Sequence, residues 1–403
     1  MSNTLKFGNG EWYGKEGTIL AYNDENNNYK PLPFNFERDS VATRVNKQGL
    51  IETVGADQPR IDYLNDSNGA LLLEPSRTNS LPYSSNFSTW SATGGASVVG
   101  NKLGVGGSND AFEFFSDGTA NTRLYYSLSN TGELSFSVFA KKNTLDYIAL
   151  YGNGGSNPRV WFNLANGTLG NQEGAGTGSI ESYGNGWYRC TMNWNSASLV
   201  NVRIYNSNEN DVFGGTTGSV YIQYAQLEEG SYATSYIPTQ GSAAVTRLAE
   251  TCSQTVTDGV IGQTEGTVYA DVNFVGSTEA ITNQIFFLRE QGSNNGYLFA
   301  GFYQGKLNCG MRVGGSLLFD AFFSSALTKG RYKIAIAYKS GDTKIYVNGV
   351  QTGFKNNSFG LTNFAEILLT GSAGTNQLGD INREFKLYNT RLTDQELAAL
   401  TQV

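Results

Sequence analysis

The sequence predicts an all-β protein built from antiparallel sandwiches, and three observations lead to this prediction. Of its 403 residues, 49 are Gly, 13% are aromatic and only 16% are charged, which suits strands joined by tight turns. Asn-Gly pairs occur seven times, and this pair favours the positive φ angles of hairpin turns. Short segments of alternating hydrophobicity lie between these pairs, as expected for strands that bury one face against a second sheet. A helix bundle is therefore excluded.

The length predicts two or three domains, because a domain typically has roughly 100–200 residues. Residues 1–80 concentrate the prolines and contain Asn-rich stretches, so we expect an extended, loop-like region for attachment or oligomerisation. Residues 81–246 form a first strand-rich block, which ends in a linker marked by Pro238 and Gly241. Residues 247–403 form a second strand-rich block.

Individual elements can be placed from the local pattern. Residues 134–140 (LSFSVFA) alternate apolar and small polar side chains, which indicates a half-buried strand. Residues 332–338 alternate in the same way, and together with the strand at 343–347 and the turn that follows they predict a three-strand meander. Near the C-terminus, Thr393 and Glu396 have the spacing of a capping box, which predicts one short helix.

Charge and composition exclude several classes of function. The net charge of −7 is not accompanied by a Lys/Arg cluster, so nucleic acid is not an expected partner. The sequence contains no His, which removes the Ser-His-Asp triad, the Cys-His pair and the His-based zinc motifs. The widely spaced Cys190, Cys252 and Cys309 form neither a zinc ligand set nor a disulfide framework, and we expect buried thiols.

The N-terminal residues lack the basic and apolar segments of a secretory signal, and no apolar run reaches ~18 residues. We therefore expect no membrane insertion and a protein that is made in a cytoplasm.

The second strand-rich block carries a resemblance to a known family. Residues 330–353 contain a strand pair that ends in a Tyr-Val-Asn-Gly turn, and residues 383–400 read Phe-Lys-Leu-Tyr-Asn before the capped helix. These motifs resemble laminin-G-like domains of the concanavalin A-like lectin/glucanase superfamily. The resemblance implies a two-sheet jelly roll over residues 247–403, and glycan binding more than a reaction.

The first two regions resemble tailed-bacteriophage virion proteins, of the tail, fibre, head-fibre or decoration type. Three segments in order carry this resemblance, namely residues 36–52, 59–79 and 225–247. It implies location in the virion after synthesis in the bacterial host cytoplasm, with other virion proteins as partners and a homo-oligomer, for fibres a trimer. Residues 184–189 (GNGWYR) and the strand from Ala225 to Gly230 also resemble carbohydrate-binding β-sandwich modules, which implies such a module at 81–246.

Four arginines in the N-terminal region have two interpretations. They could hold the N-terminal loops by pairing with carboxylates or backbone carbonyls, which we favour, or they could form an attachment interface with another virion subunit. These residues are Arg38, Arg44, Arg60 and Arg77.

Aromatic side chains are the candidate glycan platforms, because their faces stack on the apolar faces of sugars. Tyr297 and Tyr303 lie among Gly and Asn, which favours exposed carbohydrate-binding positions. Trp187 and Tyr188 lie inside an expected strand, so core packing is favoured for them. The same applies to Trp161 and Trp194.

Enzyme chemistry has no clear signature. Glucanases need two carboxylates across the scissile bond, and the sequence lacks a Glu-x-Asp-x-Glu strand that would place alternate carboxylates on one face. Without His, a metal site would need oxygen ligands, so calcium is the only cofactor considered. Its candidate ligands are Asp320, Asp342 and Asp380.

The sequence thus favours a noncatalytic component of a tailed-phage virion, a fibre or receptor-binding protein that adheres to host surface polysaccharide. Many weak sites on one particle would supply avidity. A capsid decoration or head-fibre subunit is the first alternative, and a virion glycan depolymerase is the second.

Overall fold

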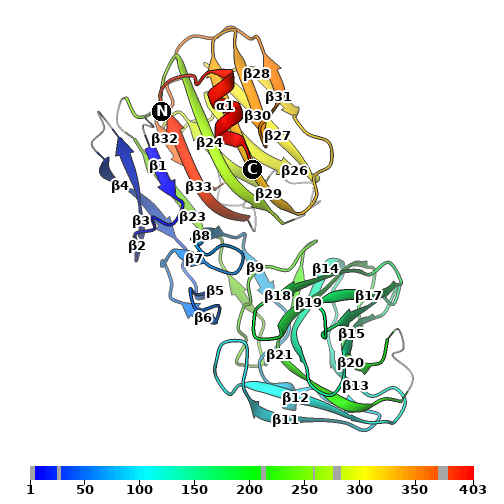
Figure 1. Cartoon of the computed structure of the whole chain (residues 1–403). Helices are drawn as coiled ribbons and strands as arrows, with labels where there is room; N and C mark the ends of the chain where they lie inside the picture. Colours follow the sequence, from blue (N-terminus) through cyan, green and yellow to red (C-terminus); the bar gives the residue numbers. More distant parts are fainter. Residues whose placement is uncertain (1–4, 25–28, 210–214, 257–258, 276–282, 371–379) are drawn as a thin grey trace. The chain divides into compact units, whose positions relative to one another are not determined.

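A computed structural model describes residues 5–24, 29–209, 215–256, 259–275, 283–370 and 380–403 (Figure 1). The regular secondary structure of the described chain is almost entirely strand, which confirms the all-β prediction. It divides into two compact units. Unit 1 comprises Met1–Val41, Val54–Ser76 and Leu248–Val403, and unit 2 comprises Ala42–Thr53 and Arg77–Arg247.

Unit 1 is a jelly roll of antiparallel strands. Its N-terminal strands are β1 (Leu5–Gly8), β2 (Gly14–Lys15), β3 (Thr18–Asp24), β4 (Tyr29–Glu37), β7 (Arg60–Asp62) and β8 (Ala70–Leu73). Its C-terminal strands are β23 (Thr251–Thr255), β24 (Glu265–Phe274), β25 (Asn283–Arg289), β26 (Tyr297–Tyr303), β27 (Lys306–Val313), β28 (Ser316–Phe322), β29 (Gly330–Lys339), β30 (Thr343–Val347), β31 (Val350–Lys355), β32 (Glu366–Leu368) and β33 (Asp380–Tyr388).

The strand order of unit 1 is β31-β30-β29-β24-β33-β1-β3-β4-β23-β32-β25-β26-β27-β28. The N-terminal strands β1, β3 and β4 therefore connect two halves that are both built from the C-terminal part of the chain. Their apolar residues, among them Phe7, Ile19 and Phe34, are buried in the same core as Val268 and Ile336.

This arrangement corrects the expectation of an extended N-terminal region at residues 1–80. Pro31 and Pro33, which suggested a loop, lie in β4 and pair with β3. On its other side β4 pairs with β23 only over residues 35–37, so neither proline interrupts a ladder there. Residues 42–53 and 77–80 belong instead to unit 2.

The C-terminal helix α1 (Asp394–Thr401) is present as predicted. The Thr393 hydroxyl accepts a hydrogen bond from the amide of Glu396, whose carboxylate accepts one from the amide of Thr393, which completes the capping box. Leu397 is buried against Tyr269 and Tyr346 on the outside of the sheet. In the described part of the chain, no helix is long and apolar enough to cross a membrane. The predicted meander is formed by β29, β30 and β31.

Unit 2 is a sandwich of two six-stranded antiparallel sheets. The front sheet has the order β10 (Ser91–Thr93), β13 (Arg123–Ser127), β20 (Asn201–Ser207), β15 (Tyr147–Asn153), β16 (Arg159–Asn163), β17 (Thr168–Glu173). The back sheet has the order β11 (Ala96–Lys102), β12 (Ala111–Asp117), β21 (Thr217–Glu229), β14 (Gly132–Lys142), β19 (Trp187–Ser196), β18 (Thr177–Ser182). The smaller elements are β5 (Ala42–Val45), β6 (Ile51–Val54), β9 (Arg77–Asn79), β22 (Val245–Arg247) and the 3₁₀ helix η1 (Phe87–Thr89).

The core of unit 2 lies between its two sheets, and Leu134, Phe136 and Val138 of β14 face it, as the alternation predicted. Ser135 and Ser137 on the other side of β14 are buried as well, so the strand is buried on both faces and the expectation of a half-buried strand is wrong. The three cysteines are buried free thiols, as predicted, and burial raises the pKa of each thiol above its ordinary value.

Candidate functional site

Both tyrosines predicted as glycan contacts lie on β26, one at each end of the strand. They are six residues apart, so they share a face and their Cα atoms are separated by about 20 Å. Leu298, Ala300 and Phe302, which alternate with this set, are buried in the core of unit 1. Tyr297 and Tyr303 therefore lie on the outward side of the sheet, which we call the β25–β28 face.

The Tyr303 end of this face carries exposed aromatic surface. The rings of Tyr303 and Phe322 have centroids 6.0 Å apart, and Phe322 on β28 is 49% exposed. The Lys306 ammonium lies 5.5 Å from the ring centre of Phe322, within cation–π distance. Sequence reasoning missed Phe322, although its position between the partly buried Ala321 and the buried Phe323 is visible in the local alternation.

A polar pair lies beside these rings. The side-chain amide of Asn308 donates to the Asp320 carboxylate at 2.8 Å and to the Ala321 carbonyl at 3.2 Å. Asn308 is opposite Phe322 and Asp320 is opposite Gly310 in the strand register. The amide is fixed by two acceptors, while the exposed Asp320 carboxylate retains acceptor sites for a hydroxyl donor.

The Tyr297 end is packed more tightly. Tyr297 contacts Phe287, and Phe287 stacks with Phe299 on the same side of the sheet. Both phenylalanines are buried. A Cβ atom at Gly310 would lie 2.4 Å from the Phe299 ring, so only glycine leaves room for this ring. Tyr297 is therefore mainly a packing residue, and Tyr303 is the better placed of the two predicted contacts.

The structure does not bring the calcium candidates together into a ligand set. Asp320 bonds to Asn308 as described, and Asp342 forms an ion pair with Arg391 at 2.9 Å. Asp380 begins β33, but its side chain lies outside the described residues. In the described part of the chain, no group of three or more Asp, Glu or Cys side chains could hold a metal ion. The calcium site stays a prediction.

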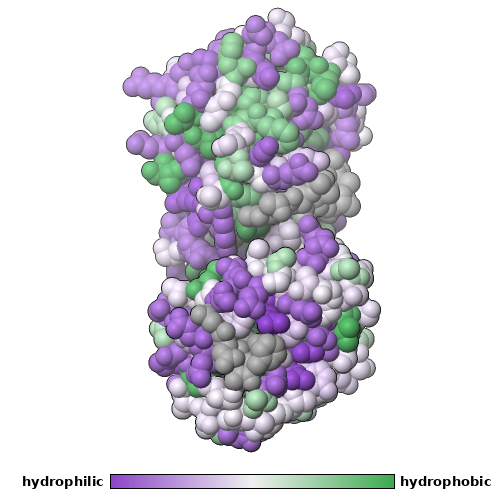
Figure 2. All heavy atoms as spheres, turned by 90° about the vertical axis from the view of Figure 1, so that its right-hand side faces the viewer, coloured by the Kyte–Doolittle hydropathy of each residue, from purple (hydrophilic) through white to green (hydrophobic). Residues whose placement is uncertain are grey.

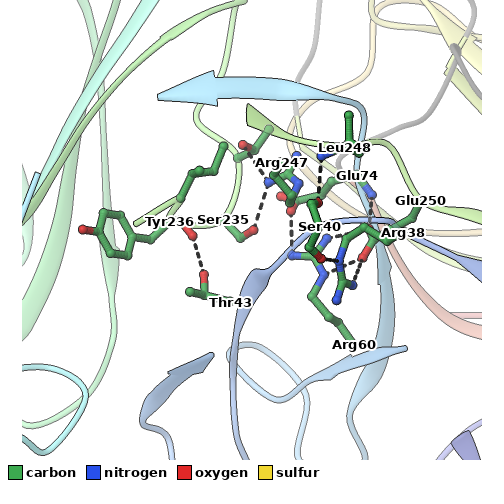
Figure 3. A network of polar contacts seen from close by, with 12 residues as sticks. Arg38, Ser40, Thr43, Arg60, Glu74, Ser235, Tyr236, Arg247, Leu248 and Glu250 are labelled. Atoms are coloured by element: carbon green, nitrogen blue, oxygen red, sulfur yellow. Dashed lines mark hydrogen bonds and ion pairs between the residues drawn. The ribbon is translucent and has the colours of Figure 1, made fainter. Parts of the chain in front are cut away.

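Two of the four N-terminal arginines form a buried ionic network in unit 1 (Figure 3). Arg38 and Arg60 both bond to the carboxylate of Glu250, at 2.7 Å and 2.5–2.6 Å. Glu74 forms a further ion pair with Arg60 at 2.8 Å. Burial alone would lower the pKa of Arg60, but the charges of Glu250 and Glu74 outweigh it and raise this pKa.

This network corrects the attachment-interface hypothesis for Arg38 and Arg60, because both are at most 1% exposed. They act within the chain, as the favoured interpretation held. Arg44 forms a half-exposed ion pair with Glu52 at 2.8 Å, and Arg77 lies 5.5 Å from the ring centre of Tyr232. An interface role for Arg44 and Arg77 stays a prediction.

The aromatic residues of the GNGWYR motif, Trp187 and Tyr188, pack within unit 2, the role favoured for them over glycan contact. Trp187 is 2% exposed and lies in a small cluster on the outside of the back sheet with Phe139 and Tyr236. Trp194 belongs to the main core of unit 2. Trp161 is also buried, but on the outward side of the front sheet, in a cluster with Tyr151 and Tyr205.

Sequence reasoning missed this outward side of the front sheet, which we call the front face. Four residues on four neighbouring strands are directly opposite one another there, namely Tyr125, Arg203, Tyr151 and Arg159. The sequence signal was available only within each strand, for example in β20, where Arg203 and Tyr205 alternate with the buried Val202 and Ile204. Which strands are neighbours could not be read from these short patterns.

Comparison with known proteins identifies part of unit 1. Residues 248–398 match the family model of the concanavalin A-like lectin/glucanases superfamily. These residues are therefore similar to concanavalin A-like domains. The laminin-G-like prediction for residues 247–403 is confirmed as a fold, and in the structure β1, β3, β4, β7 and β8 complete the jelly roll of unit 1. No characterised protein sequence matches the chain.

Solved structures of low identity also show similarity to part of this chain. The sialidase CBM40 of Ruminococcus gnavus, bound to α2,3-sialyllactose, is 17% identical over 35% of this chain and 84% of that chain, with a TM-score of 0.31. The binding domain of Paraclostridial Mosquitocidal Protein 1 is 15% identical over 38% of this chain and 43% of that one, with a TM-score of 0.31. The botulinum neurotoxin serotype G binding domain is 12% identical over 37% of this chain and 39% of that one, with a TM-score of 0.31.

Proposed function

We propose that the chain is a noncatalytic glycan-binding protein that contacts saccharide through the β25–β28 face of unit 1. The observation that carries this proposal is the exposed Tyr303–Phe322 pair beside the ordered Asn308–Asp320 pair. Aromatic faces bind the apolar side of a pyranose ring, while amide and carboxylate groups bind its hydroxyls. The family match of the same unit to lectins and glucanases supports this assignment.

The acidic residues of the β25–β28 face support binding without hydrolysis. The described residues of strands β25–β28 and of the adjacent β32 include two carboxylates, Asp320 on β28 and Glu366 on β32. These strands are four strand spacings apart, roughly 19 Å, whereas glycosidases place their carboxyls about 5–9.5 Å apart. Glu366 is also held in an ion pair by Arg289. Neither carboxylate is therefore placed to act with the other as an acid–base pair.

The proposal includes a biological setting, which rests on the sequence resemblance alone. The segments at residues 36–52, 59–79 and 225–247 resemble tailed-phage virion proteins, so we place the chain in the virion as a fibre or receptor-binding component. In that setting the glycan is host surface polysaccharide, and a homo-oligomer, for fibres a trimer, multiplies weak sites into avidity.

The test is binding of the full chain to a panel of extracted bacterial surface polysaccharides, with reducing ends assayed in the same wells. We expect saturable binding without new reducing ends. Phe322→Ala and Tyr303→Ala should each weaken binding roughly tenfold, equivalent to about 1.4 kcal/mol. Phe354→Ala is the matched control, because Phe354 is a 50% exposed aromatic residue on β31 of the same unit; it should leave binding unchanged.

Three outcomes would overturn the proposal. Release of reducing ends would establish a depolymerase. Binding that is equally strong in Phe322→Ala and Tyr303→Ala would remove the β25–β28 face as the contact. Absence of binding by the correctly assembled protein would favour a capsid decoration or head-fibre subunit.

A further inference from the structure

A row of alternating tyrosine and arginine side chains crosses the front face of unit 2. Tyr125 on β13 is opposite Arg203 on β20, which is opposite Tyr151 on β15, which is opposite Arg159 on β16. Residues in register point to the same side of a sheet. Four neighbouring strands thus present one continuous line of aromatic rings and guanidinium groups.

The guanidinium groups stack on the rings of this row. The Arg203 and Arg159 guanidinium carbons lie 4.8 Å and 5.1 Å from the ring centre of Tyr151. In the neighbouring row, the Arg123 guanidinium lies 5.8 Å from the ring centre of Tyr125. Stacking orients a planar guanidinium and leaves its N–H groups free to bind in the plane.

The neighbouring row on the same face is largely buried. The residues opposite one another in it are Arg123, Tyr205, Ala149 and Trp161. Trp161, Tyr205 and Ala149 are at most 1% exposed, and the Trp161 indole donates to the Ser207 hydroxyl at 3.0 Å. The arginines and Tyr125, in contrast, are partly exposed. The front face therefore combines buried, fixed side chains with reachable cationic groups, as a preorganised binding site requires.

The charges on this face are not balanced. Arg159 has a carboxylate partner in Glu173, at 3.2 Å. Arg203 instead donates to neutral groups, the Asn201 side-chain oxygen at 2.7 Å and the Tyr205 hydroxyl at 3.3 Å. Arg123 donates to the backbone carbonyl of Asn121 at 3.2 Å.

Glu173 is the only acidic residue among the outward positions of the described front-sheet strands. Figure 2 views unit 2 from the side on which Figure 1 draws β13, β15, β17 and β20, and hydrophilic residues lie there among residues of intermediate hydropathy. A chain with a net charge of −7 thus gathers three arginines and one carboxylate on a single sheet face.

We propose that the front face binds a saccharide that carries a carboxylate, such as a uronic acid unit of an acidic polysaccharide. The sugar carboxylate accepts hydrogen bonds from the Arg203 and Arg123 guanidinium groups, and the pyranose ring stacks on Tyr125. Arginine suits this role because its fork of donors matches the two oxygens of a carboxylate. The site lies in unit 2, so it does not depend on the β25–β28 face proposed above.

The experiment measures binding of the full chain to oligogalacturonides by calorimetry, with the fully methyl-esterified oligomers as the neutral counterpart. We expect saturable binding of the free-acid oligomers and at least tenfold weaker binding of the esters. Arg203→Gln and Arg123→Gln should each weaken free-acid binding at least tenfold. Arg203→Lys, which keeps the charge but loses the fork, should be intermediate and provides a second variant if a glutamine variant folds poorly.

Two controls separate this site from general charge and from unit 1. Lys47→Gln removes one exposed positive charge from unit 2 in the turn between β5 and β6, and should leave binding unchanged. Phe322→Ala should likewise leave oligogalacturonide binding unchanged, so failure of either proposed site can be recognised by itself.

Equal binding of the acid and the ester would overturn the proposal, as would full binding by folded Arg203→Gln. Dextran sulfate, whose negative charge comes from sulfate groups, tests whether the face requires a carboxylate. If it displaces the uronate at equal charge concentration, the face is a general polyanion site and the carboxylate assignment is wrong.

Discussion

Two pairs of arginines, one pair in each unit, are used in opposite ways. In unit 1, Arg38 and Arg60 are buried and share the Glu250 carboxylate. In unit 2, Arg203 and Arg123 are partly exposed and donate to neutral oxygens. The difference shows that the role of an arginine depends on whether a carboxylate of the chain neutralises its charge. A buried guanidinium whose charge is matched inside the chain serves stability, whereas a partly exposed one with neutral partners is available to a ligand.

The same substitution in both settings gives the largest expected effect. Arg60→Gln would leave the buried Glu250 and Glu74 carboxylates without their main cation. Removing one partner of a buried ion pair typically costs about 3–5 kcal/mol, and we expect a loss of this size in the free energy of unfolding. Urea denaturation measures this loss, and hydrogen exchange of peptides from each unit shows where in the chain it occurs.

In this experiment the peptides of unit 1 should lose protection, while those of unit 2 should not. A loss below about 1 kcal/mol would contradict the structural role of the buried network, because a solvent-exposed ion pair contributes that little to stability. Glu52→Gln, which removes the half-exposed partner of Arg44, is the matched control for that range.

Arg203→Gln should cost only about 1 kcal/mol of unfolding free energy. The variant loses the stacking on Tyr151 and two hydrogen bonds to neutral groups, but it leaves no carboxylate unpaired. The midpoint of urea unfolding checks this value. A cost near that of Arg60→Gln would show that Arg203 is a structural residue and would remove the contrast between the two units.

A partly exposed ion pair between Lys102 and Glu113 on the back sheet should have the smallest effect on stability. The pKa of Glu113 is lowered by hydrogen bonds from Lys102 and Ser219, against the effect of burial, together with the charge of Lys102 and a bond from Asn143. A carboxyl with a lowered pKa contributes stability above its unfolded pKa, and this contribution is lost as the pH falls through the folded value.

Glu113→Gln should therefore reduce stability at ~pH 7 by up to about 1 kcal/mol, and by less at ~pH 3. Urea denaturation at the two pH values measures the difference. Glu133→Gln is the control, because Glu133 is exposed at the start of β14. If both variants show the same dependence on pH, Glu113 makes no specific contribution to stability.

The sequence by itself determined the features that depend on neighbouring residues. Alternation within β14 predicted which side chains face the core between the sheets, and the Thr393–Glu396 spacing predicted the capped helix. The laminin-G-like motifs predicted the fold of residues 247–403, since each motif lies within a few consecutive elements. Tyr303 was found because Gly and Asn surround it, a signal that is also local.

Only the tertiary structure decided which distant segments meet. Arg60 and Glu250 are 190 residues apart in sequence, and β1, β3 and β4 join β33 and β23, which follow residue 250. The front-face row likewise exists only once β13, β20, β15 and β16 are neighbours. The physical reason is that period and turn chemistry fix a strand and its buried side, whereas strand pairing and charge compensation depend on the packing of the whole unit.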